Sequence, residues 1–129
     1  MGIREIWNTL EATLVKRGFA IVDSEDVQQG KRCVIRISEV IGDHPARGTV
    51  ASSVVRVTFA VNVVLVYEWG GDARVERTVA EDAEDVVHAI YTDVNLSNHK
   101  FVGATIERDP QRGVVTDTIR FDFQSQAAG

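Results

Sequence analysis

Residues 53–69 read SVVRVTFAVNVVLVYEW, an alternation of side chains that predicts one long β-strand. Every odd position from 55 to 69 is apolar or aromatic, so this face of the strand should contact a hydrophobic core. The even positions carry both polar and apolar side chains, among them Val54, Arg56, Thr58, Asn62, Val64 and Val66. The strand would therefore place three valines on a face that a single domain leaves in contact with water.

The predicted strand is longer than the domain that has to contain it. At ~3.3 Å per residue it would extend about 56 Å, whereas a chain of this length forms a domain roughly 36 Å across. We expect either a bend, for which the weak strand formers Ala60 and Asn62 mark the place, or a strand that projects from the domain. Both outcomes would offer an edge that a partner chain can cover.

The composition predicts one globular domain over residues 1–123, followed by a frayed tail over residues 124–129. Hydrophobic residues make up 44% of the 129, which is enough for a core that needs no covalent cross-links. Cys33 is the only cysteine, so no intrachain disulfide can form, and a reducing compartment is expected. The formal charge of −5 disfavours a nucleic-acid coat. We expect neither a membrane span nor a secretory signal.

The rest of the chain predicts two helices and four further strands. An apolar stripe at helical spacing predicts a helix over residues 3–17, which Gly18 would end. A second helix, over residues 78–94, would begin at the capping-box pattern of Thr78 and Glu81. The other predictions are a hairpin of strands 19–23 and 32–40, a loop at 41–52, and a final hairpin of strands 101–109 and 114–123. The order αβββαββ predicts an α+β fold, with a mainly antiparallel five-stranded sheet packed by two helices.

Four acidic residues gather at the start of the second predicted helix: Glu81, Asp82, Glu84 and Asp85. Hard cations bind clusters of carboxylates, but a helix N-terminus favours negative charge whether or not an ion binds. We therefore expect a solvated acidic surface and not a metal site.

Candidates for catalysis are weak in this sequence. Cys33 lies on the inward face of a predicted strand, where a cysteine usually serves as a small hydrophobic residue. The three histidines are scattered and show no zinc-ligand spacing. We predict no catalytic, metal-binding or cofactor-binding residues. An enzyme is left open as an alternative, with His44 or His88 as a general base beside a carboxylate.

The succession of segments resembles the tail terminator proteins of long-tailed bacteriophages. The likeness lies in the opening amphipathic helix, the mid-chain loop, the long alternating strand, the helix VAEDAEDVVHAIYTDVNL (79–96) and the hairpin FVGATIERDPQRGVVTDTIRFDF (101–123). It covers nearly the whole chain and the length agrees. The resemblance implies a homo-hexameric ring in the neck of the virion, assembled in the host cytoplasm. Such a ring caps the tail tube, stops polymerisation of the tail tube protein and docks the head-tail connector protein, while DNA passes through without specific binding.

The resemblance also implies roles for particular residues. The interface with a neighbouring subunit or the tube would comprise Arg47, Thr49, Val54, Arg56, Thr58, Asn62, Val64 and Val66. The acids Glu81, Asp82, Glu84 and Asp85 would line the lumen. Two non-enzymatic alternatives remain: another head-tail joining protein, or a binding module whose long strand pairs with a partner's strand.

Overall fold

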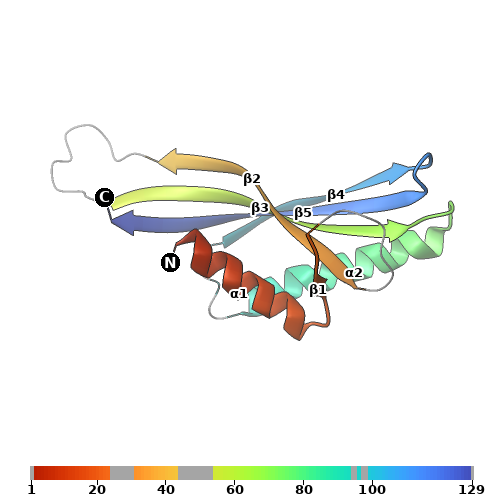
Figure 1. The fold of residues 1–129 in the computed structure, drawn as a ribbon, viewed down its shortest axis with the longest axis horizontal. Helices are drawn as coiled ribbons and strands as arrows, with labels where there is room; N and C mark the ends of the chain where they lie inside the picture. Colours follow the sequence, from red (N-terminus) through yellow and green to blue (C-terminus); the bar gives the residue numbers. More distant parts are fainter. Residues whose placement is uncertain (1, 24–30, 44–53, 94–95, 97–98, 129) are drawn as a thin grey trace.

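The computed structural model describes residues 2–23, 31–43, 54–93, 96 and 99–128, with the backbone alone described at 43, 54–56 and 125–128. Its elements, in chain order, are α1 (Ile3–Lys16), β1 (Ala20–Ile21), β2 (Arg32–Asp43), β3 (Val54–Glu68), α2 (Ala73–Thr92), β4 (His99–Asp109) and β5 (Val114–Ala128). Two helices pack on a five-stranded sheet (Figure 1), which confirms the α+β prediction.

The sheet is mixed, because its strands lie in the order β1-β2-β3-β5-β4 and β1 runs parallel to β2. Ala20 pairs with Arg32 and Ile21 with Cys33, so the predicted hairpin of residues 19–23 and 32–40 is wrong. Period-two alternation identifies a strand but carries no information on its direction.

Both helices lie on the same face of the sheet, as Figure 1 shows. Their apolar stripes contact the odd positions of the central strands, which confirms the inward face predicted for residues 53–69 at the positions that the core includes. The strand residues of this core are Cys33, Ile35, Val61, Val63, Leu65, Ile119, Phe121 and Phe123. Burial of these side chains is the main contribution that holds the two layers together.

The first helix ends as predicted, and the second begins earlier than predicted. Gly18 has a φ of 91°, and the amide of the next residue, Phe19, donates to the carbonyl of Leu14 at 3.1 Å, closing a Schellman motif. Helix α2 begins after Asp72, whose side chain accepts a hydrogen bond from the amide of Arg74 at 2.8 Å. Thr78 is already helical and donates to the carbonyl of Arg74, so the capping box at Thr78 is wrong. Asp72 is itself a strong N-cap residue and provides the earlier start.

The long strand does project from the body of the protein. The ends of β2, β3 and β5 extend beyond both helices in Figure 1. Because β5 stays paired with β3 as far as Ala128, residues 124–128 belong to a strand and the predicted frayed tail is wrong. The irregularity expected at Ala60 is not in β3, which pairs with β5 without a shift. It lies opposite, in β2, where a bulge falls between Ile37 and Glu39.

Candidate assembly surface

Two of the valines expected on an exposed face are in fact buried within one chain. Val64 is 4% exposed and Val66 is 8% exposed. They form a second cluster with Val34 and Val114 on the face away from the helices, and the half-buried Val22 packs against it. The expectation that a lone chain leaves Val64 and Val66 in water is therefore wrong. This burial could not be predicted, because Val34 and Val114 come from neighbouring strands and only the register brings them together.

The other residues predicted for the interface have mixed outcomes. Thr58 and Asn62 are half-buried on the same face as Val64. Val54 and Arg56 pair through their backbones in β3, but their side chains lie outside the described part of the structure. Arg47 and Thr49 also lie outside the described residues.

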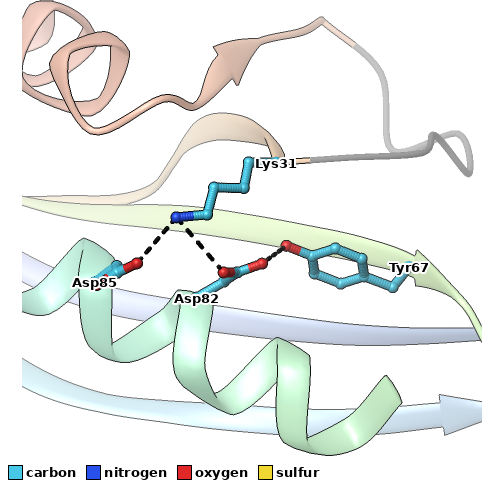
Figure 2. Close-up of polar contacts among 4 residues, drawn as sticks. All are labelled: Lys31, Tyr67, Asp82 and Asp85. Atoms are coloured by element: carbon cyan, nitrogen blue, oxygen red, sulfur yellow. Dashed lines mark hydrogen bonds and ion pairs between the residues drawn. The ribbon is translucent and has the colours of Figure 1, made fainter. Parts of the chain in front are cut away.

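The four acids of residues 81–85 lie in the middle of α2, not at its start, and do not form a uniform solvated surface. Asp82 is buried and faces the sheet, where it accepts a hydrogen bond from the hydroxyl of Tyr67 on β3 (Figure 2). Lys31, which immediately precedes β2, places its Nζ 3.0 Å from Asp85 and 3.8 Å from Asp82. The placement of Asp82 in the lumen is thus wrong, because this carboxylate bonds within its own chain. Glu84 is exposed, and Glu81 pairs with Arg77 at the surface.

This polar cluster of Lys31, Tyr67, Asp82 and Asp85 joins α2 to two strands (Figure 2). Burial, followed by the hydrogen bond to Asp82, raises the pKa of Tyr67. The hydrogen bond to Asp85 is the main reason that the pKa of Lys31 is raised. The tyrosine hydroxyl and the ammonium therefore both keep their protons at neutral pH and donate to carboxylates. We interpret the cluster as a structural connection between the layers.

Removing the Tyr67 hydroxyl tests this structural role. Tyr67→Phe should lower the free energy of unfolding by about 1–2 kcal/mol, because buried Asp82 loses a hydrogen-bond donor. Tyr91→Phe is the matched control, since Tyr91 is exposed, and should change stability by less than about 0.5 kcal/mol. Denaturant unfolding at neutral pH measures both. Equal effects for the two variants would contradict the assignment.

A second buried carboxyl, Asp117 on β5, was not identified from the sequence. It is 1% exposed and lies between Leu65 and Ile106 on the neighbouring strands, and its Oδ1 has no hydrogen-bond partner among the described residues. Burial raises the pKa of Asp117 to about 6. The alternation of apolar and polar residues in β5 could have indicated it, because Asp117 shares its face with Ile119 and Phe121.

Asp117 should make the protein less stable as the pH rises. Between the unfolded pKa of 3.8 and the folded value of about 6, the folded chain retains a proton that the unfolded chain releases, so stability falls across this window. Asp117→Asn should therefore stabilise the protein by about 3 kcal/mol at about pH 7.5 and have little effect near pH 4. Denaturant unfolding at the two pH values measures this, with exposed Glu84→Gln as the control. An equal gain in the free energy of unfolding at both pH values would contradict this prediction for Asp117.

The described residues bring together no set of catalytic groups. Cys33 is buried, and desolvation raises the pKa of its thiol to about 12, which leaves it a poor nucleophile. His88 is exposed, His99 packs against the ring of Tyr91, and His44 lies outside the described residues. Within the described ranges no group of His, Cys, Asp and Glu side chains has the arrangement of a metal site. A pocket at the turn between β4 and β5, lined by residues 107–112, Val114 and Thr116, contains no histidine.

Exposed apolar side chains instead gather at the two edges of the sheet. Ile37 and Val40 lie on the helix face of β2, and we call them the β2 patch; Val40 is 59% exposed, and Ile41 is exposed on the opposite face. Near the other edge, Val102 of β4 and Tyr91 in the last turn of α2 are exposed, and we call these two residues the β4 patch; Tyr91 is 55% exposed. Val102 falls at a bulge in β4, and Tyr91 packs on His99 at the start of that strand. These two patches are the candidate assembly surface, and nothing in the sequence pattern distinguished them from core positions.

Neither described helix has both the length and the apolar character needed to cross a lipid bilayer. The sequence matches no protein-family model and no curated protein.

Proposed function

We propose that this chain is a ring-forming structural subunit of a bacteriophage virion, a tail terminator that caps the tail tube. The observation that carries the proposal is the presence of two different apolar patches on opposite edges of one sheet. Isolated exposed apolar residues are common, but grouped ones at sheet edges indicate surfaces that another protein covers. One end of the sheet also projects beyond the helices, so neither helix covers it (Figure 1).

The ring follows from the difference between the two patches. A contact between two unlike surfaces is heterologous, and repeated heterologous contacts form a closed ring when the rotation between subunits permits closure. The resemblance to tail terminators supplies the finer proposals: a homo-hexamer, with the tail tube protein on one side and the head-tail connector protein on the other. DNA would pass through the lumen without specific binding, and exposed Glu84 remains a candidate for the lumen surface.

Particles that lack the protein provide the test. Loss of a terminator leaves tube polymerisation unchecked, so electron microscopy should show overlong tubes without heads. Normal-length tails that are detached from filled heads would instead support a head-tail joining protein. Normal virions in the absence of the protein would contradict both roles.

A further inference from the structure

We propose that neighbouring copies associate laterally and in register, with the β2 edge of one copy against the β4 edge of the next. The partner is thus a second copy of this chain, and the proposal rests on the ring-forming function above. It adds which edges meet, in which direction, and which residues face each other across the contact.

Both edges are open among the described residues. Strand β1 pairs only with Arg32 and Cys33, so from residue 34 to residue 43 β2 has a described neighbour on the β3 side alone. Strand β4 pairs only with β5. From β2 to β4 all neighbouring strands are antiparallel, so β2 and β4 run in opposite directions. A copy placed beside another in the same orientation therefore continues the antiparallel alternation of the sheet.

The register of the sheet puts complementary residues at the same level on the two edges. One row across the sheet is Glu39, Ala60, Asp122 and Lys100, on the face away from the helices. Lateral association along this row brings Lys100 of one copy to Glu39 of the next. The side chain of Glu39 is 54% exposed and lies 3.6 Å from Nη2 of Arg120 in its own chain, whereas Lys100 is exposed and has no ion-pair partner among the described residues. The contact therefore joins opposite charges.

The next row places apolar groups opposite each other on the helix face. Its members are Val40, Phe59, Phe123 and His99, and the ring of Tyr91 lies 4.8 Å from that of His99. In-register association thus packs Val40 of one copy against His99 and Tyr91 of the next. One contact joins residues of the two patches that a single copy leaves exposed, which explains why each edge carries its own apolar group.

The bulges show that the contact is made mainly by side chains. β2 has a bulge between Ile37 and Glu39, and β4 has one between Phe101 and Gly103. A bulge on an edge strand interrupts the row of backbone groups that a continuous ladder needs. Packing and the Glu39–Lys100 pair therefore supply specificity, and the association of two copies alone is weak until ring closure adds the remaining contacts.

Two edge variants give a direct test by sedimentation velocity. Val40→Arg blocks the β2 edge, and Tyr91→Arg blocks the β4 edge. Wild type should form rings as concentration rises towards about 1 mM, the range in which weak association is detected. Each variant alone should be monomeric, whereas their mixture should form a 1:1 dimer through the one edge that each retains. Val15→Arg is the matched control, because Val15 is an exposed valine on α1, and it should still form rings.

A charge exchange tests the predicted register. Glu39→Lys and Lys100→Glu should each weaken association at least tenfold, and the double variant should recover most of the loss. Glu107→Lys, on the same face of β4 but in a different row, should have little effect. No recovery in the double variant would overturn the register. Dimers of Val40→Arg alone would overturn the head-to-tail contact, since they require like edges to pair.

Failure of this inference can be separated from failure of the proposed function. A wild type that stays monomeric to about 1 mM overturns the lateral contact. Overlong tubes in particles lacking the protein would then still support a terminator. Conversely, rings that form in register from a protein whose loss leaves virions normal would support the contact and contradict the terminator role.

Discussion

Phe121→Ala is expected to lower the free energy of unfolding by about 3–5 kcal/mol. Phe121 is completely buried, and its ring centroid lies 5.4 Å from that of Phe101 and 6.2 Å from that of Phe123. It belongs to the core that α1 and α2 form with the sheet, so truncation leaves a cavity between the layers. Because the protein interior is closely packed, the surrounding side chains can fill only part of this volume. Denaturant unfolding monitored by circular dichroism measures the change.

The matched control is Ile106→Ala at the edge of the same face. Ile106 is 36% exposed, so removal of its side chain should lower stability by less than about 1 kcal/mol. If Phe121→Ala were equally mild, the two helices would not cover this face of the sheet as described. A change in the denaturant slope as well as the midpoint would indicate that the variant alters compactness in addition to stability.

The core and the elements could be predicted from the sequence because they depend on local patterns. Alternation placed Val61, Val63 and Leu65 on the inward face, and helical spacing with Gly18 placed the first helix to within one residue. These signals come from residues that are close in sequence and obey a fixed geometric period. These local signals do not depend on how the rest of the chain packs.

The relations between elements could not be predicted, because they depend on contacts distant in sequence. The alternation in residues 19–23 is the same whether the strand pairs parallel or antiparallel with β2. The capping-box pattern at Thr78 indicated a helix start, whereas α2 begins after Asp72, which caps its first turn. The partners of Asp82 are Lys31 and Tyr67, which lie far from it along the chain. The acidic residues next to Asp82 suggested that its side chain is exposed to solvent, whereas on α2 this side chain faces the sheet.

The position of the candidate assembly surface could not be predicted either, because it too depends on contacts between residues distant in sequence. From its length, the sequence predicted a strand that either bends or projects, and the structure shows the second outcome. Sequence reasoning assigned the exposed apolar residues to β3, but β3 is central and both its neighbours help to bury it. The exposed groups lie on the edges, at Val40 and Tyr91. Which strand becomes an edge is set by the order of strands in the sheet, and a single sequence does not specify that order.

Val64→Asp should lower the free energy of unfolding by about 3–5 kcal/mol, enough to unfold a domain of ordinary stability. The new carboxylate would lie among Val34, Val66 and Val114, an apolar cluster on the face away from the helices. An unpaired charge in an apolar setting either remains ionised at the free-energy cost of its desolvation or takes up a proton. Both outcomes destabilise the folded chain at neutral pH. Thermal and denaturant unfolding at about pH 7.5 would measure the loss.

Val40→Asp is the control that separates burial within a chain from burial between chains. Val40 is 59% exposed, so the variant should stay within about 0.5 kcal/mol of wild type as a folded monomer while losing self-association. The hypothesis that Val64 lies in a subunit interface makes the opposite prediction, since an interface residue can become charged without unfolding the subunit. A stable, monomeric Val64→Asp variant would thus restore β3 as the assembly face. An unfolded one leaves assembly to the two edges, because the valines of the second face are already covered by their own chain.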